Sequence, residues 1–290
     1  MDSDPSVSAR LAGDVHRSLG NIWLTGITAP EVAAEYDSVG LPPVCRYFAA
    51  RAAPLGAASA SLVTATFFNF SPTAVARAIP TAWQHCRPSD VLSAQARGVE
   101  RALHRAFAGI EPTRISVAAA QLRHVATLAG GLTEGRPLFS GYASLPWSDS
   151  PLLDLYQANY MLREFRGDGH IAVLLGSGLR GIDAVNLHRI STPSLGPTFI
   201  RSRGWTSGEW DESTLRLVSR GLVARNAPGE LTLSESGRAL RSTMEQRTDE
   251  LAAAPFHEAG ETMCRDLLAA GEVIEPALSA AGLLGRTTRD

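Results

Sequence analysis

The chain has 290 residues, of which 44% are hydrophobic and 19% charged, and its formal net charge is −2. This length can bury one large core or two modest ones, and we expect two packed lobes. The near-neutral charge excludes a general electrostatic attraction to nucleic acid or membranes. No apolar run approaches the roughly 18 residues that span a bilayer, and the first residues lack an export pattern. We therefore expect a cytoplasmic protein without membrane contact.

All 27 basic residues are arginines. Without lysine there can be no Schiff base, pyridoxal phosphate anchor or P-loop lysine, and we expect no cofactor. Any anion would have to be bound by arginine, whose planar guanidinium can donate two parallel hydrogen bonds to carboxylate, sulfate or phosphate. Cys45, Cys86 and Cys264 lie too far apart for a zinc motif and are expected to be buried, reduced thiols.

Residues 1–135 are expected to form a helical N-terminal lobe that starts with an acidic helical arm over residues 8–40. Alanine-rich stretches predict the helices that follow, and Pro54, Pro72 and Pro88 stand where a proline can start or stop a helix. These predicted helices cover residues 44–53, 58–70, 72–83, 88–108 and 115–128.

Residues 41–136 carry an excess of positive charge, because they hold 10 arginines against 4 acidic residues, a net charge of +6. Around residues 64–69, hydroxyl and amide groups alternate with bulky apolar side chains. This mixture is typical of a small-molecule pocket, and also of a helix that is buried on one side and solvated on the other. In the pocket interpretation, the binding residues are Arg46, Arg51, Arg77, Thr66 and Asn69.

A glycine-rich stretch at 130–137 is the best candidate for a linker, and residues 136–255 are expected to form a second lobe. A helix is predicted from residue 151 to about 165. Tyr156, Tyr160 and Arg163 recur at helical spacing on one of its faces. The tyrosine rings could pack half-buried with their hydroxyls in solvent, or these residues could line a pocket. We keep all three as candidate substrate-binding residues.

The motif Arg166-Gly167-Asp168-Gly169-His170 predicts a turn at the end of this helix. In the simpler interpretation, Asp168 caps a new helix that begins at His170. In the functional one, Asp168 and His170 are a catalytic acid and base, and Arg166 binds an anionic group beside them. One residue can serve both purposes.

Residues 176–181 read Gly-Ser-Gly-Leu-Arg-Gly, which formally matches the glycine motif of dinucleotide-binding folds. Such a fold would need a preceding strand at 171–175 and an acidic residue about 20 positions later, where the chain has Arg201. A turn between two helices is therefore favoured over a dinucleotide site.

Residues 204–252 have the order helix, hairpin, helix that is typical of a winged-helix module. Trp210, Thr214, Leu217 and Val218 share one face of its first helix, residues 226–229 form the turn of the hairpin, and Ser234 caps the last helix. The start of the first helix, which would enter a DNA groove, carries only acidic charge, at Glu209, Asp211 and Glu212. Residues 151–255 hold 12 arginines and 12 acidic residues, so DNA is an improbable partner.

Residues 256–290 are predicted to form a last helix and a tail. His257, Glu261 and Cys264 recur at helical spacing and could offer three metal ligands on one face. A fourth ligand is missing and Gly260 would interrupt the helix, so a solvated face with a buried thiol is favoured and no metal site is expected.

Several motifs together resemble a large actinobacterial family of helical proteins, usually described as uncharacterised or helix-turn-helix. Its C-terminal half is similar to the MarR-type winged helix. The resemblance covers nearly the whole chain and implies a mainly α fold with a helical N-terminal lobe, a winged-helix-like C-terminal lobe and one short β-hairpin. It implies no catalytic residues. The motifs lie at residues 47–56, 63–70, 135–138, 162–170 and 203–206.

Two classes of function follow. The first is an enzyme of specialised metabolism that binds an anionic substrate in an arginine-lined pocket between the lobes. Without lysine or metal it would catalyse proton transfer, elimination or cyclisation. The second is a MarR-type regulator that senses a ligand in the same pocket. The placement of charge favours the first class, and the fold resemblance favours the second. The expected partner is an anionic small molecule, with a homodimer or a small partner protein left open.

Overall fold

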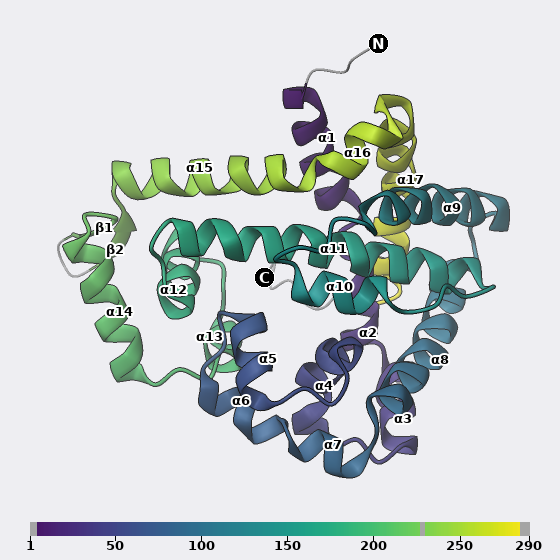
Figure 1. The fold of residues 1–290 in the computed structure, drawn as a ribbon, viewed down its shortest axis with the longest axis horizontal. Coiled ribbons are helices and arrows are strands. Elements are labelled where there is room, and N and C mark those ends of the chain that lie inside the picture. The colour runs from purple at the N-terminus through teal and green to yellow at the C-terminus, as the bar shows by residue number, and fades with distance from the viewer. Residues whose placement is uncertain (1–4, 227–229, 285–290) are drawn as a thin grey trace.

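The protein is described by a computed structural model that covers residues 5–226 and 230–284. In these residues it is a mainly α protein with one antiparallel hairpin, which confirms the predicted fold class (Figure 1). None of the described helices is long and apolar enough to cross a membrane.

The helices of the first 150 residues are mostly short, and several begin at a proline. A proline suits the first helical position because the N–H group that it lacks would have no partner there. Pro72 and Pro88 start helices as predicted, whereas Pro54 lies in a 3₁₀ turn (Ala53–Leu55). The α-helices are α1 (Pro5–Leu19), α2 (Thr25–Thr28), α3 (Pro30–Ser38), α4 (Arg46–Ala52), α5 (Ala60–Phe67), α6 (Pro72–Ala78), α7 (Thr81–His85), α8 (Pro88–Ala106), α9 (Pro112–Ala129) and α10 (Pro137–Ala143).

The winged-helix order predicted for residues 204–252 is confirmed. Thr206 and Glu209 form a capping box at the start of α14, and the Ser234 hydroxyl accepts the backbone N–H of Gly237 at the start of α15. The hairpin pairs Val223 with Leu233, and most of its predicted turn, residues 227–229, lies outside the described residues. The later elements are α11 (Pro151–Gly176), α12 (Gly181–Ser191), α13 (Pro197–Ser202), α14 (Ser207–Ser219), β1 (Val223–Arg225), β2 (Leu231–Leu233), α15 (Glu235–Ala252), α16 (Ala254–Ala259) and α17 (Glu261–Ala280).

The turn predicted at residues 166–170 is wrong, because α11 continues through it without a break. Instead, the glycine at position 169 allows the Arg136 side chain to lie close to α11. A Cβ atom at this position would lie 2.8 Å from a guanidinium nitrogen of Arg136, which crosses the helix. Asp168 therefore does not cap a helix that begins at His170. Its carboxylate accepts the backbone N–H of Phe139 in α10, a residue 29 positions away.

The glycine motif at 176–181 forms a turn between α11 and α12, as favoured above. Residues 171–175 are helical, which rules out the dinucleotide interpretation. The metal interpretation also fails, because α16 ends before Gly260, whose φ is +87°, and His257 and Cys264 belong to different helices. No group of three potential metal ligands occurs in the described part of the chain. The three cysteines are buried thiols, as expected.

Hydrophobic residues pack on both sides of α11. One large core contains buried residues between positions 11 and 165 together with α16 and α17. Two smaller clusters, which together are called the second core, surround α12, α14, the hairpin and α15. In Figure 1, α11 passes through the middle of the molecule, with α15 beside it and α5 and α13 below it. The central turns of α11 therefore lie between the two cores. The division of the chain into separate units stays a prediction, with bounds at 1–135, 136–255 and 256–290.

Candidate functional site

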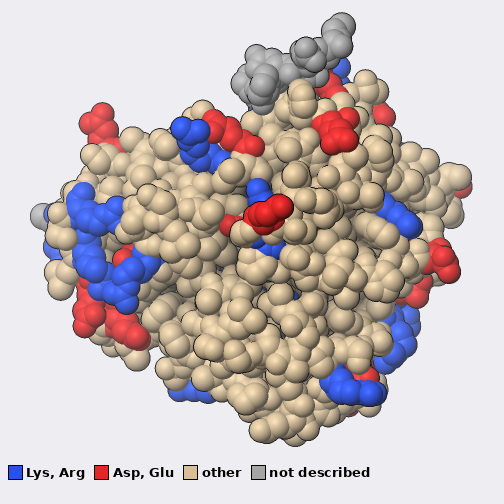
Figure 2. Space-filling view, viewed as in Figure 1, with Lys and Arg blue, Asp and Glu red and all other residues tan. Residues whose placement is uncertain are grey.

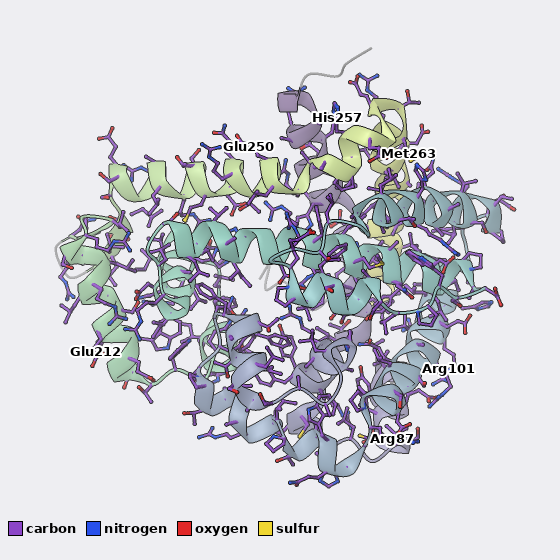
Figure 3. The ribbon with its side chains drawn as sticks, viewed as in Figure 1. Arg87, Arg101, Glu212, Glu250, His257 and Met263 are labelled. Carbon is purple, nitrogen blue, oxygen red and sulfur yellow. The ribbon has the colours of Figure 1, made fainter. Side chains whose placement is uncertain are left out.

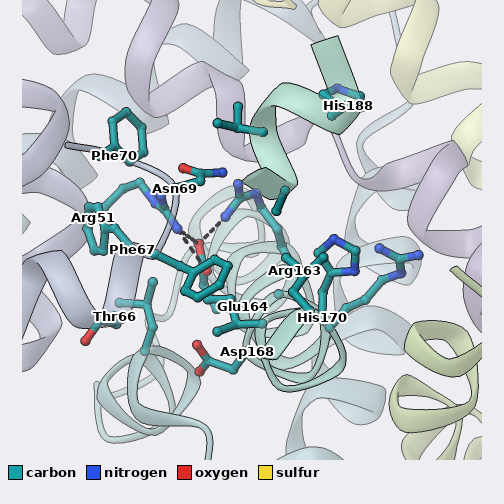
Figure 4. Close-up of a pocket in the computed structure, with 18 of the residues that line it drawn as sticks. Arg51, Thr66, Phe67, Asn69, Phe70, Arg163, Glu164, Asp168, His170 and His188 are labelled. Atoms are coloured by element: carbon teal, nitrogen blue, oxygen red, sulfur yellow. Dashed lines mark hydrogen bonds and ion pairs between the residues drawn. The ribbon is translucent and has the colours of Figure 1, made fainter. Parts of the chain in front are cut away.

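A cavity of about 450 Å³ lies against the middle of α11. Helices α4 and α5 form one side of it, and α12, α13 and α15 form the other. Of the residues predicted from sequence, those that line it are Arg51, Thr66, Asn69, Arg163, Arg166, Asp168 and His170. They span more than 100 residues of sequence, and the fold brings them to one cavity (Figure 4).

Four predicted binding residues lie outside the cavity. Tyr156 and Tyr160 are packed edge to face at 5.5 Å inside the larger core, and their hydroxyls have no partner among the described residues. Arg46 forms an ion pair with Asp37 at 2.5 Å on the surface, and Arg77 is exposed on α6. The helical spacing was right for the tyrosines, but the face that they share is turned toward the core.

One carboxylate is shared by two arginines at the centre of the cavity wall. Glu164 is 2% exposed, and both of its oxygens accept N–H groups of Arg51 at 3.1 Å, while Arg163 bonds the same carboxylate. Burial by itself would lower the pKa of Arg51, but the charge of Glu164 raises it well above its usual value. Arg51 therefore stays charged, and two guanidiniums on one carboxylate give the cluster of three one net positive charge (Figure 4).

Arg203 is a cavity residue that the residue-by-residue prediction missed. It forms no ion pair with any carboxylate of the described residues, and its guanidinium lies 4.6 Å from the ring centre of Phe70 and 4.4 Å from that of Phe199. It donates to Asn69 Oδ1 at 3.5 Å, and the Tyr47 hydroxyl lies beside it. Burial and the neighbouring arginines lower the pKa of Arg203. The sequence did contain a signal for this residue, because Arg203 is the first residue of the 203–206 motif.

A second cation that lines the cavity, Arg241 of α15, also has no acidic partner among the described residues. It bonds the hydroxyl of Ser191 and lies 3.5 Å from Nδ1 of His188. Burial lowers the pKa of His188, so this imidazole is neutral at pH 7 and can accept a hydrogen bond. Arg166, in contrast, is neutralised by Glu245 and Asp249, each at 2.9 Å. Arg203 and Arg241, which have no acidic partners among the described residues, thus add to the positive charge of the Arg51, Arg163 and Glu164 cluster.

Asp168 and His170 leave α11 in different directions, as residues two apart on a helix must (Figure 4). Asp168 bonds the backbone of α10, whereas Nδ1 of His170 lies 2.8 Å from the hydroxyl of Thr248 in α15. Burial raises the pKa of Asp168 to about 6 and lowers that of His170. No hydrogen bond joins the two side chains in the described residues, so each would have to act alone on a ligand.

The pH dependence of stability is expected to carry the signature of Asp168. Because burial raises its folded-state pKa from 3.8 to about 6, its contribution is full below 3.8 and is lost as the pH rises to about 6. Asp168→Asn keeps an acceptor for the Phe139 N–H group and does not titrate, so it should remove this loss. Asp168→Ala leaves that N–H without a partner and should cost about 1–3 kcal/mol. Urea unfolding of the three proteins between pH 4 and 8 measures both effects, and parallel pH profiles would contradict the assignment.

The exposed face of α14 does not have the charge of a DNA-reading helix. Asp211, Glu212 and Leu215 are exposed on it, and Figure 3 shows Glu212 on the outer side of the helix. Arg216, the basic residue of this helix, is held by Asp183 at 2.8 Å. In Figure 2, a group of basic side chains covers part of this end of the molecule, and acidic side chains lie directly next to it. A phosphate backbone would meet mixed charge here.

No curated protein and no solved structure matches the chain. A family model described as a helix-turn-helix family matches residues 12–285, which is nearly the whole chain. The chain therefore belongs to this helix-turn-helix family.

Proposed function

We propose that this protein binds an anionic small molecule in the cavity between its two cores. The observation that carries the proposal is the charge of the wall: Arg203 and Arg241 face the cavity without acidic partners, and Glu164 is shared by two further arginines. An unpaired cation in a partly buried site is costly unless an anion arrives to compensate it. Functional sites are where such a cost is tolerated.

Acid–base turnover of the bound molecule is a second candidate, favoured by Asp168. Its carboxyl lines the cavity, and a pKa of about 6 lets it hold or release a proton near neutral pH. His170 would assist from its own position. The reaction would be a proton transfer, elimination or cyclisation in specialised metabolism, and the Asp168→Asn variant would then bind the molecule without converting it.

The family membership favours a third use, in which a MarR-type regulator binds DNA and responds to the ligand. The acidic face of α14 argues for weak and unspecific DNA binding. Fluorescence anisotropy with the upstream region of the protein's own gene, at physiological salt, should show no sequence-dependent affinity below the micromolar range. Tight and specific binding would make DNA recognition the primary activity.

Calorimetric titration with 2-naphthoate, an aromatic carboxylate that fits a cavity of this size, tests the main proposal. Wild-type protein should bind it, and Arg203→Gln should weaken binding by about tenfold or more, because a charge-assisted hydrogen bond is lost. Arg77→Gln removes an exposed arginine outside the cavity and should bind within about twofold of wild type. Equal affinity in all three proteins would overturn the proposal.

The stability of Arg203→Gln provides a control for folding. In the absence of ligand this variant should be at least as stable as wild type, because it loses a cation that has no acidic partner among the described residues. Thermal unfolding of both proteins measures this. A large loss of stability would mean that Arg203 is structural, and Arg241→Gln would then provide the independent test of binding.

A further inference from the structure

Tyr47 of α4 is a cavity residue in an unusual electrostatic position. Its ring packs against Phe48 and Phe70, with ring centres 5.5 and 5.4 Å apart, so the residue is held in place by aromatic neighbours. Its hydroxyl accepts an N–H group of Arg51 at 3.2 Å. Neither acid–base chemistry nor the anion site described above makes use of this residue.

No group of this cluster accepts a hydrogen bond from the Tyr47 hydroxyl in the described residues. The charged groups around it are the guanidiniums of Arg51, Arg163 and Arg203, and a guanidinium has five donors and no acceptor. Glu164, the carboxylate of the cluster, accepts from Arg51 and Arg163, and no hydrogen bond joins it to Tyr47 in the described residues. Within the described part of the chain the Tyr47 hydroxyl accepts from Arg51 and donates to no partner, so its O–H is available to a ligand.

The neighbouring charges also strengthen this donor. Burial raises the pKa of Tyr47, but the positive charges of the three arginines outweigh burial and lower it below its usual value. A more acidic phenol gives a stronger hydrogen bond to an anionic acceptor.

We propose that Tyr47 donates a hydrogen bond to an oxyanion of the ligand and, together with Arg203, selects a carboxylate carried on an aromatic ring. This inference rests on the proposed anion site and names its ligand class. The ring is expected because the walls beside these two groups are aromatic: Phe70 and Phe199 flank Arg203, and Phe67 lies 4.4 Å from the guanidinium of Arg51. Flat rings pack well against such walls and against guanidinium planes.

The test compares wild type and Tyr47→Phe in titrations with 2-naphthoate and with its neutral isostere 2-naphthamide. Phenylalanine keeps the packing on Phe48 and Phe70 and removes only the hydroxyl. We expect 2-naphthoate to bind Tyr47→Phe about tenfold to a hundredfold more weakly, since one hydrogen bond to a charged acceptor is lost. The weaker affinity for 2-naphthamide should change by much less.

A pH series separates a hydrogen-bond donor from a packing residue. As the pH rises toward the lowered pKa of Tyr47, the phenol loses its proton, and the wild-type affinity for 2-naphthoate should fall. Tyr47→Phe should lack this component. If 2-naphthoate depends on Arg203 but binds Tyr47→Phe as tightly as wild type at every pH, the role of Tyr47 is overturned and the anion site stands. If wild type binds no 2-naphthoate, or if Arg203→Gln has no effect, both fail.

Discussion

Replacing Glu164 by glutamine is expected to lower the free energy of unfolding by about 3–5 kcal/mol. Glu164 is 2% exposed and compensates Arg51, which is itself 8% exposed, as well as Arg163. Removing one partner of a buried ion pair leaves the other charges without compensation, and here two guanidiniums would be left. Urea unfolding at pH 7 measures the change.

Two comparisons make this prediction specific. Glu245→Gln removes a half-exposed partner of Arg166, which keeps Asp249, and should cost less than about 1 kcal/mol. Sulfate or 2-naphthoate should restore part of the stability of Glu164→Gln, because an anion in the cavity replaces the missing charge. A loss below 1 kcal/mol, or no response to anions beyond that of wild type, would contradict the central role of Glu164.

The second large effect is expected for Gly181→Ala at the start of α12. A Cβ atom there would lie 1.8 Å from the backbone oxygen of Phe68, a cavity residue whose φ of +59° is rare for a side-chain-bearing residue. Backbone cannot move aside as a flexible side chain can, so we expect a loss of about 3 kcal/mol in unfolding free energy. The affinity for 2-naphthoate should fall as well, because α12 and the 68–70 segment both form the cavity wall.

Gly176→Ala is the matched control for this prediction. It lies in the same glycine motif, at the end of α11, and a Cβ atom there would meet nothing within 4 Å. Alanine is the better helix former, so stability should stay the same or rise slightly. Similar stabilities of the two variants would mean that the close approach of Phe68 and Gly181 is not a constraint of the native fold.

The elements whose signals are local were predictable from sequence. The capping box at Thr206 and Glu209, the cap at Ser234 and the apolar face of α14 all depend on residues a few positions apart. The turn at 166–170 was mispredicted because its glycine and aspartate serve distant groups. Gly169 makes room for Arg136, and Asp168 caps α10. Tertiary contacts of this kind leave no periodic pattern in the sequence.

The use of the cavity as a binding site stays a prediction, and only part of its lining was named from the sequence. An arginine-lined cavity between the lobes was expected, and seven of the residues named for it line the observed one. Which arginines lack an acidic partner depends on ion pairs between residues that are far apart in the sequence. Arg51 and Arg166 already have carboxylates, whereas Arg203 lacks one among the described residues. Sequence spacing cannot reveal that difference, because the partners of Arg51 and Arg166 lie 113 and 83 positions away.

The position of a bound aromatic carboxylate is the most direct test of the proposed anion site. A crystal of the protein soaked with 6-bromo-2-naphthoate would locate the ring through the anomalous signal of bromine. We predict one site in the cavity, with the carboxylate at Arg203 and the Tyr47 hydroxyl and the ring against Phe70 and Phe199. Bromine bound elsewhere, a carboxylate turned away from Arg203, or an empty cavity at saturating ligand would contradict the proposed anion site.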